Sequence, residues 1–293
     1  MTVLGNGISR RAVLLSAAAL SACNGARPKG AVPPKTLEAA VAGAWRSSAD
    51  RARDPWRHPA ESLRFWGLKP GATVVEFWPG AGWYSDIVAP YLAATGGKFY
   101  AAGLQPGDPE GQAMMAAYRH RLEASPGLYG KIGFSAFGPT SGPVAPAGSA
   151  DLALFLRNLH NWMAAGLAEK AFRDAFAALK PGGVLGVEEH RADPAAVPDV
   201  MAASGYVPQA YVIQLGQEAG FTLAAASEIN ANPKDDHNHP FGVWTLPPVR
   251  RSSLRGQPAD PNFDHAKYDA VGESDRMTLK FVKPLSKPDS PHG

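Results

Sequence analysis

The chain is poor in cysteine: Cys23 is the single cysteine among 293 residues. A disulfide needs two cysteines, so none can form within this chain. The same count excludes a cysteine-rich zinc site and a C-x-x-C redox pair. The chemistry of this protein must therefore depend on other residue types.

Long apolar runs are also scarce. Residues 12–20 form a short apolar run after Arg10 and Arg11, too short to span a bilayer permanently. This pattern predicts a signal peptide at residues 1–22, and the pair of arginines also fits a twin-arginine export signal. Residues 20–23, Leu-Ser-Ala-Cys, resemble the bacterial lipobox, which implies cleavage before Cys23 and lipidation of Cys23. We therefore expect a periplasm-facing lipoprotein of the bacterial cell envelope that contacts the membrane through its N-terminal lipid only.

The chain also lacks a strong excess of positive or of negative charge. The whole chain has a formal net charge of +3 with histidine neutral, and two of these charges are Arg10 and Arg11 of the leader. The mature chain is therefore close to neutral, at +1. Such a balance gives no argument for binding nucleic acid.

The stretch at residues 73–90 carries the main local motif, although it has neither G-x-G-x-x-G nor G-K-[ST]. Val74 and Val75 favour a buried strand, and Glu76 stands near its end. A turn with Gly80 and Gly82 follows, and a helix can start after it. Glycines in such a turn let backbone approach a ligand closely, and the helix N-terminus offers unpaired N–H groups.

Strands and helices alternate along most of the chain. Further strands are predicted at 98–102, 132–137, 151–156, 184–187, 221–223 and 276–284. Helices are predicted at 36–53, 60–66, 83–90, 109–124, 166–179 and 206–220. This order predicts a doubly wound α/β sheet. The predicted organisation is a tether at 23–35, a helical cover at 36–67, a domain at 68–284 with a long loop at 250–275, and a tail at 285–293.

The motif E-x-x-x-G-x-G resembles the first motif of class I S-adenosylmethionine-dependent methyltransferases. Glu76, Gly80 and Gly82 match that motif, and Trp78 stands where the family usually has its first glycine. The Leu-Lys-Pro-Gly-Gly turn at 179–183 resembles the same place in the family. The resemblance implies a Rossmann-like sheet, mostly parallel with an antiparallel last strand and helices on both faces. It also implies S-adenosylmethionine bound at Glu76, Trp78, Gly80, Gly82 and Asn158.

A subgroup of exported methyltransferase-like proteins has a similar motif, in which Trp78 and the following Pro-Gly-x-Gly-Trp-Tyr are usual. The resemblance therefore places this chain in an exported lipoprotein subgroup. The family usually has an acidic residue after its second strand, where this chain has Gly103, Leu104 and Gln105.

Polar residues follow the predicted strands at 151–156 and 184–187. Open α/β sheets bind ligands beyond the carboxyl ends of such strands. His160 is our candidate for a catalytic base acting on a small-molecule acceptor, with Glu188 or His190 as alternatives. The polar residues after the strand at 151–156 could instead form a strand-to-helix cap with an aromatic residue packed on it. Asp54, Arg57 and His58, which precede the domain, could reach a ligand as well. The remaining candidates are Arg157, Asn158 and Trp162.

A second polar cluster lies at 235–239. Asp236, His237 and His239 are weak candidates for a metal site. The segment is rich in turn residues, and His237 and His239 would point apart on an extended strand. We therefore expect no metal.

Two functional hypotheses follow from the sequence. The first is an envelope-anchored S-adenosylmethionine-dependent methyltransferase whose acceptor the sequence does not name. The second is a methyltransferase scaffold reused as a periplasmic ligand- or metal-binding lipoprotein without methyl transfer. Trp78, the missing acid after the second strand and the export signal motivate the second hypothesis.

Overall fold

The computed structural model describes residues 32–105, 107 and 109–285. The predicted leader, Cys23, most of the predicted tether and most of the predicted tail lie outside these residues. Within the described ranges, no helix has both the length and the apolar composition that crossing a bilayer requires.

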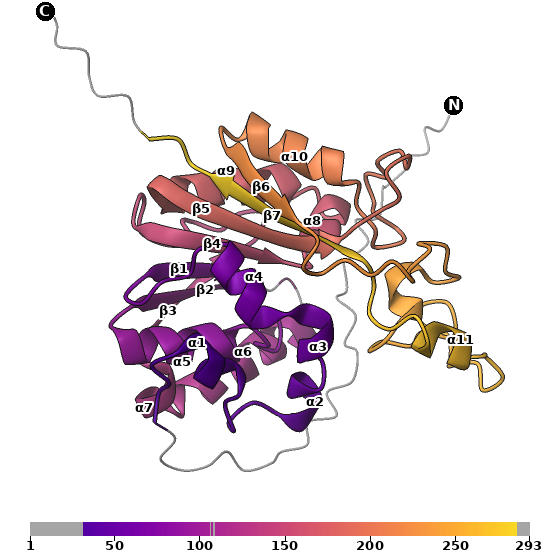
Figure 1. The fold of residues 1–293 in the computed structure, drawn as a ribbon, viewed down its shortest axis with the longest axis horizontal. Helices are drawn as coiled ribbons and strands as arrows, with labels where there is room; N and C mark the ends of the chain where they lie inside the picture. Colours follow the sequence, from indigo (N-terminus) through magenta and orange to yellow (C-terminus); the bar gives the residue numbers. More distant parts are fainter. Residues whose placement is uncertain (1–31, 106, 108, 286–293) are drawn as a thin grey trace, which may run out of the picture.

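A seven-stranded sheet lies at the centre of the molecule, in the order β3-β2-β1-β4-β5-β7-β6 (Figure 1). Its strands are β1 Thr73–Phe77, β2 Lys98–Leu104, β3 Ile132–Phe137, β4 Ala150–Leu156, β5 Leu179–His190, β6 Thr222–Ser227 and β7 Arg276–Val282. The pairs among β1 to β5 are parallel, and β7 is antiparallel to both β5 and β6. The prediction of a doubly wound sheet with an antiparallel last strand is confirmed. The strand order reverses between β1 and β4, which is where such sheets bind ligands.

Helices cover both faces of the sheet. One face packs against α1 (Leu37–Val41), α4 (Pro59–Phe65), α5 (Ser85–Thr95), α6 (Pro109–Glu123) and α7 (Pro126–Tyr129). The other face packs against α8 (Leu159–Ala164), α9 (Ala168–Ala178) and α10 (Gln209–Glu218). The sheet therefore has a hydrophobic core on each side.

The central strands β1 and β4 are apolar because both of their faces are buried. Val75 and Phe155 point into the core on the α9 side, whereas Val74 and Leu154 point into the core on the α5 side. This alternation explains why both strands are nearly continuous apolar runs in the sequence.

The N-terminal cover differs from the single helix predicted at 36–53. The structure has α1, then α2 (Ser48–Arg51) and α3 (Asp54–Arg57). The helix stops near Gly43, where an added Cβ would lie 2.3 Å from the ring of Trp45. The Trp45 indole N–H donates to the Asp86 carbonyl at 2.7 Å, and Ser47 caps α2 by accepting from the Asp50 N–H. A tertiary contact and a local cap therefore override the helical periodicity.

The cover is joined to the sheet at Trp66, just after α4. This side chain is fully buried, and its indole N–H donates to the Leu279 carbonyl of β7 at 3.0 Å. Gly186 of β5 makes room for it, since an added Cβ would lie 2.6 Å from the indole.

The segment between β6 and β7 has little regular structure. It contains η1 (Gly242–Thr245) and α11 (Ala266–Asp269). Polar side chains hold it to α4 and to the sheet: Asn230 donates to Ser62 Oγ of α4 at 3.0 Å and to Thr278 Oγ1 of β7 at 2.9 Å. Arg191 bonds to Asp275 on one side and to Glu228 on the other.

Candidate functional site

A cavity of about 270 Å³ lies beyond the carboxyl ends of β1 and β4. It is lined by Asp50, Arg53, Arg57, Trp78, Pro79, Gly80, Ala81, Trp83, Leu156, Arg157 and Asn158. The cavity therefore sits at the point where the strand order reverses, between the loop after β1, the loop after β4 and the N-terminal cover.

The loop after β1 has three residues with positive φ: Trp78 at 45°, Gly80 at 58° and Gly82 at 91°. An added Cβ at Gly80 would meet nothing within 4 Å, so the backbone there borders open space. At Gly82 a Cβ would lie 2.3 Å from the Arg121 guanidinium and 2.9 Å from the Tyr118 ring. Gly80 thus leaves room at the cavity, whereas Gly82 allows α6 to pack closely.

Trp78 is one of the residues that line the cavity, and its ring packs in the hydrophobic core. The indole N–H donates to the Phe137 carbonyl at 2.9 Å, and the ring packs edge-on against Trp162 at 5.8 Å between centroids. The Asn158 side-chain amide donates to the Trp78 carbonyl at 2.9 Å and to the Leu156 carbonyl at 3.3 Å. Asn158 therefore ties together the two loops that border the cavity.

Glu76 is close to the cavity in sequence but does not line it. The side chain is buried, and its carboxyl group accepts from Ser85 Oγ at 2.7 Å; Ser85 Oγ also contacts the Tyr118 hydroxyl at 2.9 Å. Burial raises the pKa of Glu76 from about 4.5 to about 7. Glu76 thus joins β1 to α5 and α6.

Directly after β2, the described chain continues with Gln105 rather than with an acidic residue. The Gln105 amide donates to Thr140 Oγ1 at 2.7 Å, and Gln105 Oε1 accepts from the Thr140 N–H at 3.1 Å. The side chain that follows β2 is therefore engaged with the loop after β3.

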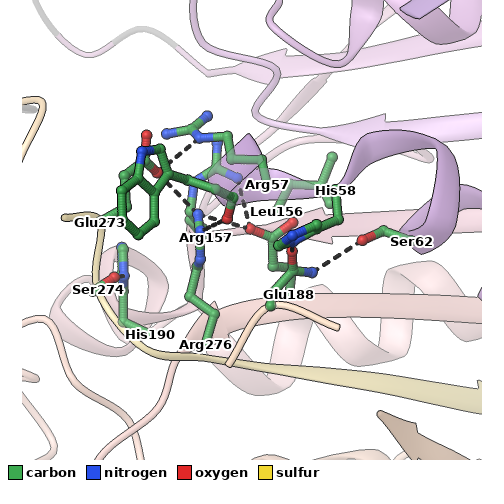
Figure 2. Close-up of polar contacts among 12 residues, drawn as sticks. Arg57, His58, Ser62, Leu156, Arg157, Glu188, His190, Glu273, Ser274 and Arg276 are labelled. Carbon is green, nitrogen blue, oxygen red and sulfur yellow. Dashed lines mark hydrogen bonds and ion pairs between the residues drawn. The ribbon is translucent and has the colours of Figure 1, made fainter. Parts of the chain in front are cut away.

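Three arginines that line the cavity, Arg53, Arg57 and Arg157, belong to a network of arginines and glutamates. Figure 2 shows Arg57 and Arg157 with Glu188, Glu273 and Arg276 of this network. Its members are Arg53, Arg57, Arg157, Arg276, Glu188 and Glu273. Four guanidinium groups thus meet two carboxylates, an excess of two positive charges, which Asp50 at the same cavity reduces to one. The electrostatic field favours an anionic group.

Glu273 holds the N-terminal side of this network. Its carboxylate accepts from Arg53 Nε at 2.7 Å, Arg57 Nε at 2.9 Å and Arg276 at 3.1 Å. Burial lowers the pKa of Arg53, and Glu273 offsets only part of that effect. The guanidinium of Arg57 also lies over the Trp83 ring at 4.9 Å, which fixes its position beside the cavity.

Glu188 holds the other side, at the end of β5. This fully buried carboxylate accepts from the Tyr84 hydroxyl at 3.0 Å and pairs with Arg157 at 3.0 Å and Arg276 at 3.2 Å. Arg157 has a φ of 57°, an uncommon conformation for a residue with a Cβ, and its N–H donates to the Glu188 carbonyl at 2.7 Å. Burial lowers the pKa of Arg157, but the nearby carboxylates outweigh it and the net shift is upward. Glu188 acts here as an anchor for two arginines.

A second group of candidates meets at the carboxyl ends of β4 and β5. His160 Nδ1 lies 3.0 Å from Glu189 Oε1, and the rings of His160 and His190 are 5.3 Å apart between centroids. His190 Nδ1 lies 2.5 Å from Ser274 Oγ. Burial, followed by His160 and two arginines, lowers the pKa of His190 well below its usual value. The fold therefore brings together two histidines that are 30 positions apart.

In the cluster at 235–239, His237 and His239 point to different partners. Asp235 is its buried centre, which accepts from the Tyr206 hydroxyl and pairs with His239 at 2.8 Å. Asp236 lies on the exposed side, 3.6 Å from His239. His237 turns away to Asp275, whose hydrogen bond raises the pKa of His237. Asp236, His237 and His239 thus do not converge as one group of three.

Asp54, Arg57 and His58, the candidates that precede the domain in sequence, have different surroundings in the structure. Arg57 lines the cavity. Asp54 pairs with Arg46, and His58 Nδ1 lies 3.3 Å from Asn230 Oδ1. Asp50, Arg53, Glu273 and Arg276 were missed, because nothing in their local sequence shows that distant segments meet here.

Comparisons with known proteins identify the fold. No family model matches the chain, and no curated protein does. Among solved structures, the [4+2]-cyclase SpnF has 18% identity and a TM-score of 0.50, with 83% of each chain covered. A geranyl diphosphate methyltransferase in complex with GPP and sinefungin has 13% identity and a TM-score of 0.50, covering 78% of this chain and 77% of that one. A SAM-dependent methyltransferase from Aquifex aeolicus has 19% identity and a TM-score of 0.49, covering 61% and 87%.

This chain has the Rossmann-like fold of class I methyltransferases. The first two neighbours named above are a cyclase and a methyltransferase, so one fold hosts different reactions. The function of this chain must therefore be argued from its own cavity.

Proposed function

We propose that this protein is an S-adenosylmethionine-dependent methyltransferase that acts on a small molecule. The observation that carries the proposal is the cavity at the strand reversal, which combines an open glycine backbone at Gly80 with an excess of arginine. The fold supports it, because open α/β sheets bind their ligands at this point. When bound, the cofactor would supply an electrophilic methyl group.

The side chains of the cavity fit the amino-acid end of that cofactor. Arg57 and Arg157 suit its carboxylate, since guanidinium groups pair well with carboxylates. Asp50 and Asn158 Oδ1 suit its ammonium group. At about 270 Å³, the cavity is just below the ~300–1,000 Å³ of sites that enclose a whole drug-sized ligand. The nucleoside end would therefore lie outside this cavity, where the acid usual in the family after β2 is missing.

His160 is the residue that we place against the methyl acceptor. Its ring is held by Glu189, which is itself fixed by the backbone N–H groups of Leu159 at 2.6 Å and His190 at 2.8 Å. A ring oriented in this way can take a proton from an acceptor hydroxyl or amine. His160→Ala should lower turnover while leaving cofactor affinity near the wild-type value. Equal loss of both would indicate a structural role.

Calorimetric titration of residues 24–293 with S-adenosylmethionine, and separately with S-adenosylhomocysteine, tests the proposal. We expect micromolar binding that Gly80→Trp weakens at least about tenfold, because the new side chain occupies the cavity. Gly96→Trp is the matched control: Gly96 also has a positive φ, at 77°, and open space around it, but it caps the far end of α5. Absence of binding by folded, ligand-free protein would refute the proposal.

We further propose that the mature chain is anchored in the bacterial envelope by a lipid on Cys23. Support comes from the leader and the Leu-Ser-Ala-Cys sequence alone. Mass spectrometry of the membrane-extracted protein should find Cys23 as a lipidated N-terminus, and Cys23→Ser should move the protein to the soluble fraction. An unmodified Cys23 within an uncleaved leader would contradict this proposal.

A further inference from the structure

The cluster of His160, Glu189 and His190 has the donor set of a transition-metal site. One ligand atom from each of the three residues lies within 4.8 Å of the other two. Two histidines with one carboxylate are a recurring set for zinc and for other divalent transition metals. The residues come from α8 and from the end of β5, so rigid elements hold them.

The contacts around the cluster orient each donor. Glu189 accepts from the N–H groups of Leu159, His160 and His190, so its carboxylate is fixed with Oε1 toward His160 Nδ1. Ser274 Oγ engages His190 Nδ1, which leaves Nε2 as the free ring nitrogen. Metal-binding sites show the same feature, in which neighbouring groups fix the ligand side chains.

The distances are suitable as well. Two ligands bonded to one zinc ion at ~2.1 Å are separated by ~3.0–3.4 Å at the usual angles, and His160 Nδ1 is 3.0 Å from Glu189 Oε1. Glu189 is fully buried and His160 is nearly so, and Trp244 packs against the His160 ring at 5.9 Å. An ion there would be shielded from solvent on that side.

The other acidic and histidine cluster is a weaker site. The Asp235 carboxylate already accepts from the Tyr206 hydroxyl, the His237 N–H and the Asp275 N–H, and it also pairs with His239. An ion there would have to displace several of these contacts. The Glu189 carboxylate of the His160 cluster likewise accepts from three backbone N–H groups. In that cluster, however, the His190 ring keeps Nε2 without a bond to any described residue, because Ser274 engages its Nδ1.

We infer that His160, Glu189 and His190 form a binding site for a divalent transition-metal ion such as Zn²⁺. This revises the expectation that the protein takes no metal, because the sequence shows these histidines only as separate residues. The site itself does not depend on the proposed function. Its part in catalysis does: a metal ion held here would lower the pKa of an acceptor hydroxyl or amine, so that its proton would pass to solvent water rather than to His160.

Titration of the chelator-treated mature chain with Zn²⁺ alone tests the inference, with Co²⁺ absorption as a second probe. We expect one equivalent of Zn²⁺ to bind, and a visible Co²⁺ band that Zn²⁺ abolishes. His190→Gln and Glu189→Gln should each weaken binding by about 10- to 100-fold or more. His239→Gln, in the other cluster, should leave binding unchanged.

Folding is checked by circular dichroism. If the buried Glu189→Gln variant does not fold, His190→Gln still tests the inference. His190 is partly exposed, so we expect its substitution to leave the fold intact. Absence of zinc binding by folded wild type would overturn the inference. Loss of binding in His239→Gln but not in His190→Gln would overturn it too, since the ion would then lie at 235–239. Zinc binding without S-adenosylmethionine binding would refute only the proposed function.

Discussion

At the scale of single residues, Trp78 shows how a side chain can stand at a glycine position. Its φ of 45° costs a residue with a Cβ roughly 1–2 kcal/mol. The indole offsets this cost by its hydrogen bond to Phe137 and its packing against Trp162. Because the ring is directed into the core, the loop after β1 keeps the open backbone at Gly80 that a ligand needs.

Glu76 gives a prediction on pH at the same scale. The unfolded chain has a pKa near 4.5 at this residue and the folded chain about 7. Between these values the folded state binds more protons, so stability falls as pH rises from 4.5 to 7 and the loss is complete above 7. A difference of about 2.5 in pKa corresponds to about 3 kcal/mol. Glu76→Gln should remove this fall.

The measurement is urea unfolding of the wild type and Glu76→Gln at several pH values from 4.5 to 8. The free-energy difference between the two proteins should shift in favour of the variant as pH rises. Glu61→Gln on the exposed side of α4 should follow the wild type throughout. Parallel curves for Glu76→Gln and wild type would contradict the prediction.

At the scale of elements, β3 and β4 are the strands whose bounds were predicted best. The bounds predicted for β3 are those observed, and those for β4 differ by one residue, because both faces of β4 are buried and its sequence is apolar throughout. The N-terminal cover was predicted less well, since α1 ends where Trp45 meets Gly43 and Asp86, contacts that no local pattern contains. Sequence patterns report local burial, but they do not report which distant surface causes it.

The contact between α4 and β5 gives a prediction at this scale. Gly186→Ala places a methyl group about 2.6 Å from the rigid Trp66 indole, so it should destabilise the protein by about 1–3 kcal/mol. Gly103→Ala in β2 is the matched control, because its Cβ meets the flexible end of Met115 at 2.4 Å, which can move aside. Urea unfolding should show a smaller loss for Gly103→Ala. Similar losses for both variants would mean that Trp66 can shift as easily as Met115.

At the scale of the whole molecule, the candidate site joins segments from both ends of the described chain. Arg53 and Arg57 precede β1, Arg157 follows β4, and Glu273 precedes β7. The sequence placed Asn158 and His160 near the site because they follow a central strand. It could not place Glu273 there, because that position depends on how the long segment after β6 folds back over the N-terminal cover.

Glu273 therefore gives a prediction about the assembly of the site. Its almost completely buried carboxylate bonds to Arg53 and Arg57, both more than 200 positions earlier in the chain, and to the nearby Arg276. Glu273→Gln leaves Arg53 and Arg57 without this counter-charge, whereas Arg276 keeps its pairing with Glu188. Breaking a buried ion pair from one side costs about 3–5 kcal/mol, so we expect Glu273→Gln to destabilise the protein by about that amount.

Unfolding by urea measures this effect, with Glu228→Gln as the control. Glu228 also bonds to an arginine, Arg191, but its side chain is 68% exposed, so its loss should cost less than about 1 kcal/mol. A Glu273→Gln protein as stable as Glu228→Gln would mean that water or neighbouring carboxylates already neutralise the arginines. A large loss for Glu273→Gln alone would establish that the segment before β7 holds the N-terminal cover, and with it two of the cavity's arginines, in place.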